Sequence, residues 1–172
     1  MRLTGSKRRK YSAGIFLLFG ILAGAASAAP GLDSAAQLLS RAESLKTVDN
    51  ATFARMLQEL KGRTTELSET QRWRLRYLQA YQNAYIGQEE PARAQLEVIA
   101  KQAPDSTLRT IAIGTLINVL GVGHHYDEAF QYLDQALDNL PQITDKDARF
   151  HLLGEASQLL SDAGQYELAA SY

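Results

Sequence analysis

The sequence predicts an all-α fold, built from antiparallel helix hairpins that repeat along the chain. The clearest hairpin lies between Thr110 and Pro141, where two stretches with apolar residues at three- and four-residue spacing are separated by Gly121 and Gly123. We expect these two glycines to break the helix. Similar stretches precede and follow this hairpin. With 45% hydrophobic and 22% charged residues, the chain has the composition of a folded globular protein.

Residues 1–28 have the pattern of an export signal. The first ten residues contain five basic and no acidic side chains, and an apolar run from Ile15 to Ala23 follows. The small residues up to Ala28 predict cleavage after that position. The alternative is an uncleaved signal anchor, because the uncharged stretch 11–32 is long enough to span a bilayer. Both alternatives predict export across the cytoplasmic membrane, with or without an anchor.

Residues 29–67 are predicted to form a divergent pair of helices. The first covers 33–46, with Asp33 as its N-cap, and the second covers 50–61 and ends at Gly62. Apolar residues recur at helical spacing in both. A helix pair of this kind suits the amino-terminal cap that a repeat array needs.

Residues 68–172 are predicted to continue as helix hairpins. The sequence from Ser68 to Gln71 is a capping box, which begins a helix that runs to about Ile86. Further helix starts are predicted at 89–91, at Asp105 or Ser106, and at Thr144 and Asp145. Because the last apolar pattern is still open at Tyr172, we expect the last repeat to be truncated and a further domain to follow.

A short motif recurs within these hairpins. Its members in the clearest hairpin are Gly123, Tyr126, Ala129, Leu133, Ala136 and Pro141. An earlier copy contains Gly87, Ala92, Leu96, Ile99, Ala100 and Pro104, and a later one contains Gly164, Tyr166 and Ala169. The motif resembles the tetratricopeptide repeat, whose usual period is about 34 residues; here the alanines are 37 and 40 residues apart. The resemblance implies hairpins stacked as an α-solenoid. The alternative is an ordinary helical bundle with coincidental spacing.

One helix face carries candidate binding residues. Tyr77, Tyr81 and Tyr85 recur every fourth residue near Arg74, so they share a face. In tetratricopeptide repeats the first helix of each hairpin lines a concave groove. On that resemblance the same face of the later hairpins carries Asn118, His151, Glu155 and Gln158. Aromatic and amide side chains suit a peptide or protein partner. The alternative is that the tyrosines pack between repeats with their hydroxyls at the rim.

Catalytic and metal-binding constellations are not predicted, and we expect no enzyme activity from these residues. The chain has no cysteine, which excludes thiolate metal sites and cysteine nucleophiles. His124 and His125 lie in a turn without a carboxylate at ligand spacing, so no metal is expected. The sequence from Gly121 to Gly123 lacks the third glycine of a dinucleotide-binding motif, and no cofactor is expected. Since the chain after its first ten residues is acidic, a nucleic-acid partner is not expected either.

The order of the segments carries a second resemblance. A basic head, a signal or anchor, a helix pair and loose repeats together resemble the periplasmic N-terminal sensor region of a bacterial membrane-bound GGDEF diguanylate cyclase. No GGDEF or kinase motif is present. The resemblance implies a periplasmic interaction or sensor module that binds a peptide or protein in its groove. Contact with the membrane is then expected only through the N-terminal segment or a later helix. The alternative is the regulatory part of a diguanylate cyclase or histidine kinase whose catalytic domain follows residue 172.

Overall fold

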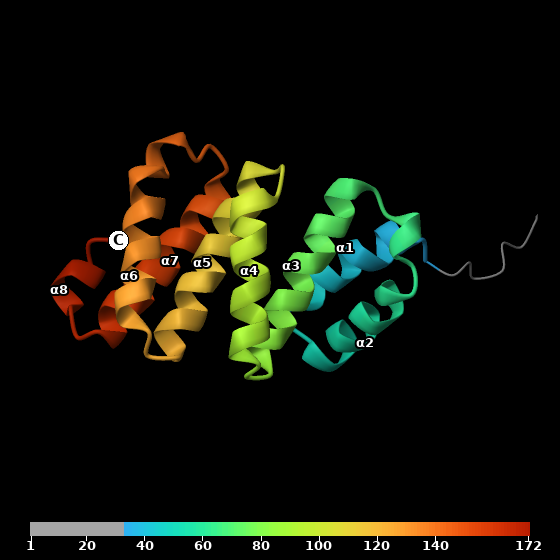
Figure 1. Cartoon of the computed structure of the whole chain (residues 1–172), viewed down its shortest axis with the longest axis horizontal. Helices are drawn as coiled ribbons and strands as arrows, with labels where there is room; N and C mark the ends of the chain where they lie inside the picture. The colour runs from blue at the N-terminus through green and yellow to red at the C-terminus, as the bar shows by residue number, and fades with distance from the viewer. Residues whose placement is uncertain (1–32) are drawn as a thin grey trace, which may run out of the picture. The chain divides into compact units, whose positions relative to one another are not determined.

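The computed structural model describes residues 33–172, and these residues are all-helical, as predicted (Figure 1). The α-helices are α1 (Ala35–Leu45), α2 (Asn50–Lys61), α3 (Glu69–Tyr85), α4 (Glu89–Gln102), α5 (Ser106–Val122), α6 (Tyr126–Asp138), α7 (Lys146–Asp162) and α8 (Tyr166–Ala169). Two short 3-10 helices, η1 (Thr64–Glu66) and η2 (Leu140–Gln142), lie in the connections. The predicted export signal falls outside the described residues.

Side-chain caps fix where several helices begin. The Ser68 hydroxyl accepts the backbone N–H of Gln71, whose side chain accepts the N–H of Ser68, so the predicted capping box of α3 is confirmed. Asp105 and Asp145 cap α5 and α7. The predicted N-cap of α1 is wrong: Ser34 forms the cap, in a second capping box with Gln37, one residue after the predicted position.

The hairpin turns share one backbone conformation. The residue two positions before α4, α6 and α8 has a positive φ: 75° at Gly87, 62° at His124 and 77° at Gly164. After each of them, a backbone N–H reaches back five residues to a carbonyl at 2.8 Å, which closes the same type of turn. Of the two predicted breaks, the one at Gly123 is confirmed, because this residue is the C-cap of α5. The one at Gly121 is wrong, because this glycine is buried within α5, and His124 occupies the left-handed position.

The core is continuous along the consecutive helices. Helix α3 packs on α4, α4 packs on α5, and α5 packs on α6. Ala92, Ala129 and Ala136 are buried, as their recurrence predicts. The largest fully buried side chains are Phe53, Leu60, Leu78, Leu96, Ile99, Leu116, Ile117, Leu120, Leu152 and Leu159.

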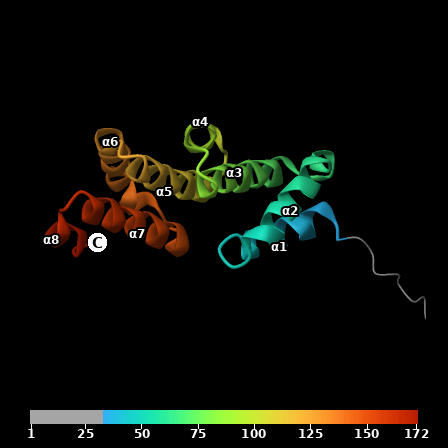
Figure 2. The same cartoon turned by 90° about the horizontal axis from the view of Figure 1, so that it is seen from below.

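Helix α7 departs from this succession, because it packs extensively on α5 and only slightly on α6. Two glycines of α5 permit the close approach. A Cβ at Gly114 would lie 2.9 Å from Cδ2 of His151, and a Cβ at Gly121 would lie 3.2 Å from Cδ1 of Leu159. Helices α4 and α6 lie on one side of α3 and α5, with α1 and α7 on the other (Figure 2). The two junctions between hairpins therefore differ in packing: α4 packs extensively on α5, whereas α6 contacts α7 only slightly.

Within residues 33–172, every helix is too short or too polar to cross a membrane.

Candidate functional site

A cluster of polar side chains joins the helices on the side of α3 and α5 that α1 and α7 share. We call it the polar cluster, and its members are Lys46, Tyr77, Tyr81, Thr115, Asn118, His151 and Glu155. Five of these residues are predicted binding residues. Tyr77 is buried between α3 and α5, and its hydroxyl lies 3.1 Å from Oγ1 of Thr115. Burial raises the pKa of Tyr77 to about 12, so this hydroxyl stays protonated.

The hydroxyl of Thr115 lies at the centre of three contacts. Its oxygen lies 3.1 Å from the carbonyl oxygen of Ile111, 3.1 Å from the hydroxyl of Tyr77 and 3.4 Å from Nε2 of His151. Thr115 therefore links α3, α5 and α7 through hydrogen-bonding groups.

Glu155 lies one turn after His151 on α7. Its Oε2 accepts a hydrogen bond of 2.8 Å from the side-chain amide of Asn118 on α5, and its Oε1 lies 3.7 Å from Nδ1 of His151. Burial raises the pKa of Glu155, while the hydrogen bond from Asn118 opposes that shift. Burial, together with the positive charge of Lys46, lowers the pKa of His151. Both shifts disfavour the charged forms of these two side chains.

Lys46, just beyond α1, brings a positive charge to the tyrosines. Its Nζ lies 5.2 Å from the ring centroids of both Tyr77 and Tyr81, within range of a cation–π interaction. Burial lowers the pKa of Lys46, and the nearby Tyr81 and Glu43 oppose that shift. The Tyr81 ring also meets Phe53 of the core edge-on, with 6.1 Å between their centroids. Tyr81 is therefore held in place while part of its ring remains accessible.

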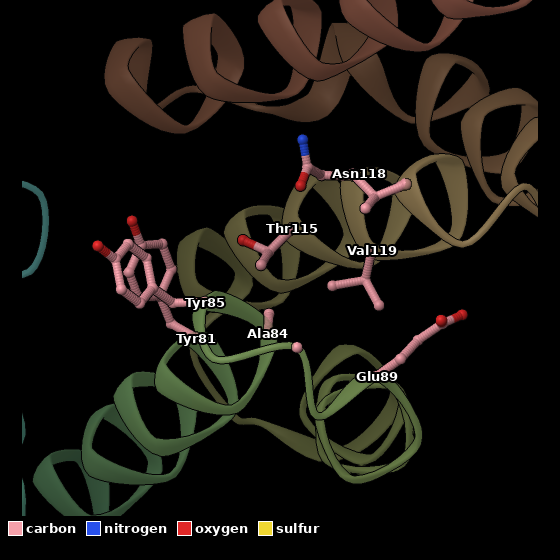
Figure 3. Close-up of a pocket in the computed structure, with 9 residues that line it drawn as sticks. Tyr81, Ala84, Tyr85, Glu89, Thr115, Asn118 and Val119 are labelled. Atoms are coloured by element: carbon pink, nitrogen blue, oxygen red, sulfur yellow. The ribbon is translucent and has the colours of Figure 1, made fainter.

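A pocket of about 400 Å³ opens beside the polar cluster, between α3 and α5 (Figure 3). We call it the α3–α5 pocket. It is lined by Tyr81, Ala84, Tyr85, Gly87, Glu89, Thr115, Asn118, Val119 and Val122. Tyr85 is 62% exposed and Val122 is 71% exposed, so large apolar surface lies at its rim. Figure 3 shows Tyr81 and Tyr85 projecting from α3 while Thr115, Asn118 and Val119 come from α5. The pocket thus combines apolar walls with hydroxyl and amide groups.

The other predicted residues lie outside the polar cluster. Tyr85 is at the pocket rim, whereas Arg74 is exposed, with its guanidinium 3.8 Å from Glu43. Gln158 is exposed and donates to Asp162 on its own helix at 2.8 Å. The tyrosines that the sequence grouped therefore divide into a buried one, a partly buried one and an exposed one. The alternative interpretation, that the tyrosines pack between repeats, fits Tyr77. Its hydroxyl, however, is hydrogen-bonded to Thr115 in the interior and does not lie at the rim.

Sequence reasoning missed Lys46 and Thr115. Thr115 had a usable signal, because it lies one helical turn before Asn118 and so shares its face. Lys46 had none, because only the packing of α1 on α3 brings it to the tyrosines. We also expected no carboxylate near the turn that contains His124 and His125. The structure shows one, because Oε1 of Glu89 on α4 lies 3.1 Å from Nε2 of His125.

The order Thr115, His151, Glu155 matches the residue types of a nucleophile–base–acid triad, but the geometry does not suit that role. A nucleophilic hydroxyl must reach its substrate, and the base must be hydrogen-bonded to the acid. Thr115 is only 6% exposed, and Nδ1 of His151 lies 3.7 Å from Oε1 of Glu155. Within residues 33–172, no three histidine or acidic side chains converge as metal ligands. This arrangement is suited to binding through hydrogen bonds and charge.

Comparison with known proteins finds no matching family model, no matching curated protein and no matching solved structure. What the polar cluster and the α3–α5 pocket bind must therefore follow from their own side chains. These offer exposed aromatic rings, an amide, a half-buried carboxylate and one ammonium group.

Proposed function

We propose that this protein is an extracytoplasmic interaction or sensor module of tetratricopeptide-like repeats, which binds a peptide or protein along the α3–α5–α7 face. The α3–α5 pocket carries the proposal. It is open, apolar at its walls, and rimmed by the exposed Tyr85 and Val122. Exposed aromatic surface next to hydrogen-bonding groups is typical of the hot spots of peptide interfaces. The residues present act as a binding module rather than as an enzyme.

The repeat interpretation has structural support in the hairpin turns. The left-handed residues Gly87, His124 and Gly164 are 37 and 40 residues apart, which equals the spacing of Ala92, Ala129 and Ala169. Equal conformations at equal register favour a repeated unit over coincidence. The extensive packing of α7 on α5 makes the last hairpin an irregular member of such an array.

The test is peptide selection on the full chain, followed by affinity measurement. Peptides enriched from a random library are labelled with fluorescein, and their Kd is measured by fluorescence anisotropy. The variant Tyr85→Ala should weaken binding about thirtyfold, the loss expected for a hot-spot aromatic residue. Because Tyr85 is largely exposed, this substitution should leave the helical circular dichroism signal unchanged.

Tyr166→Ala is the matched control, because Tyr166 is 70% exposed and lies on α8, away from the pocket lining. Its peptide affinity should equal that of the unaltered chain. Failure to enrich any peptide, or equal weakening by both substitutions, would contradict the proposed binding face.

The proposed extracytoplasmic location is supported by the N-terminal sequence alone. Its basic head, apolar run and the small residues ending at Ala28 are the features that export signals share. Amino-terminal sequencing of protein from the cell envelope should find Ala29 first. An intact Met1 on a membrane-embedded product would support the signal anchor instead.

A further inference from the structure

Glu155 is a half-buried carboxylate without a cationic partner. Among the described residues, the only basic side chain within 4 Å is His151. Nδ1 of His151 lies 3.7 Å from Oε1 of Glu155, which is longer than a hydrogen bond, and burial lowers the pKa of this imidazole and so disfavours its charged form. A carboxylate with 21% exposure has lost much of its hydration, so a positive charge that reached it would stabilise it.

The surroundings of Glu155 suit a ligand that brings such a charge. Asn118 holds one carboxylate oxygen in place and also lines the α3–α5 pocket. Burial is the main cause that raises the pKa values of Tyr77 and Tyr81, and the negative charge of Glu155 adds a smaller increase to both, so this carboxylate lies near both tyrosines. The ammonium group of Lys46 already makes cation–π contacts with both of these rings, so the rings can accept a cation. A carboxylate beside aromatic faces is the chemistry that recognises ammonium and guanidinium groups.

We propose that Glu155 and Asn118 form a subsite for a lysine or arginine side chain of the bound peptide, whose neighbouring apolar residue occupies the α3–α5 pocket. This inference rests on the proposed function and adds the chemical class of the ligand. Lys46 and Arg74 line a hollow near α1 together with the acidic Glu43 and Asp105, so positive and negative charges are balanced there. Glu155 on α7 has no lysine or arginine nitrogen within 4 Å among the described residues, so the basic residue of the ligand is directed toward α7.

The subsite can be tested without a selected peptide. The probes are Nα-acetyl-lysine methylamide and its norleucine counterpart, which lacks the charge, titrated separately into the full chain. The NMR signals of the Asn118 side-chain amide should shift saturably with the lysine probe and stay still with the norleucine probe. Glu155→Gln should weaken the lysine probe at least tenfold. Glutamine keeps an acceptor for Asn118, so the fold is retained.

Glu167→Gln, on exposed residue 167 of α8, removes the same charge and should leave binding of the lysine probe unchanged. Equal shifts with both probes, no shift with either, or full binding by Glu155→Gln would each overturn the subsite. Selected peptides that depend on Tyr85 but contain no basic residue would also overturn it, while leaving the proposed function intact. Selected peptides that ignore Tyr85 would instead contradict the proposed function.

Discussion

Gly114 is the position where the packing of α7 on α5 can be tested most directly. An alanine Cβ there would lie 2.9 Å from Cδ2 and 3.0 Å from Nε2 of His151. Alanine gains about 1 kcal/mol over glycine in a helix interior. Overpacking costs about 1–3 kcal/mol. Displacing the imidazole also weakens its hydrogen bond to Thr115, a loss of about 0.5–1.5 kcal/mol. The net expectation for Gly114→Ala is a loss of about 0.5–3.5 kcal/mol of unfolding free energy.

Gly154 provides the matched control for this substitution. It lies within α7, and an added Cβ would meet no atom within 4 Å. Gly154→Ala should therefore show only the helix-propensity gain, a stabilisation of about 1 kcal/mol. Urea denaturation of the full chain, followed by circular dichroism, measures both variants on one scale.

Removal of the obstructing ring identifies the cause of the loss. In a His151→Ala background the same Gly114→Ala change should become stabilising, since its steric neighbour is gone. The double-mutant cycle should then give a coupling free energy of about 1.5–4.5 kcal/mol, the sum of the overpacking cost and the lost hydrogen bond. If Gly114→Ala stabilises the unaltered chain as much as Gly154→Ala does, α7 does not approach α5 at this point and the reasoning is refuted.

Two further predictions concern the hairpins. Gly87→Ala should destabilise the chain by about 1 kcal/mol, because alanine is strained at a positive φ and no other atom lies within 4 Å of the added Cβ. His124→Gly should instead stabilise the chain by up to about 1 kcal/mol, because glycine relieves the same strain. Thermal unfolding measures both, and stability changes of the same sign would contradict the shared turn. Ala129→Leu should overpack the seam between α5 and α6 and cost about 1–3 kcal/mol. The exposed control Gln131→Ala should change stability by at most about 0.5 kcal/mol, and a tolerated leucine would argue against close packing at Ala129.

The helices were predictable because their signals are local. Capping at Ser68 and apolar spacing around Ala129 depend on residues within a few positions of one another, and both predictions are confirmed. The error at Gly121 has a physical cause: glycine either ends a helix or permits close packing, and only a neighbouring helix decides between them. Leu159 of α7 is that neighbour, and it lies far along the chain.

The candidate site was only partly predictable, for a related reason. Periodicity placed Tyr77 and Tyr81 on one face and Glu155 one turn after His151. It could not tell that Tyr77 is buried, because burial depends on how closely α5 approaches α3. The hydrogen-bond partners of Thr115 were beyond the sequence as well, since Tyr77 and His151 come from other helices.

The last prediction concerns the pH dependence that Glu155 imposes on stability. Burial raises its pKa in the folded chain above the ordinary value of 4.5, so the folded state holds this proton more tightly than the unfolded state. Stability from this group is therefore present at low pH and is lost as pH rises from about 4.5 through the folded pKa. Glu155→Gln should be more stable than the unaltered chain at neutral pH, and its advantage should shrink as pH falls toward 4.5. Urea midpoints across this range measure the difference, with Glu167→Gln expected to follow the unaltered chain. A destabilised Glu155→Gln at neutral pH would mean that the carboxylate is already compensated in the free protein, and the reason for a cationic ligand would be lost.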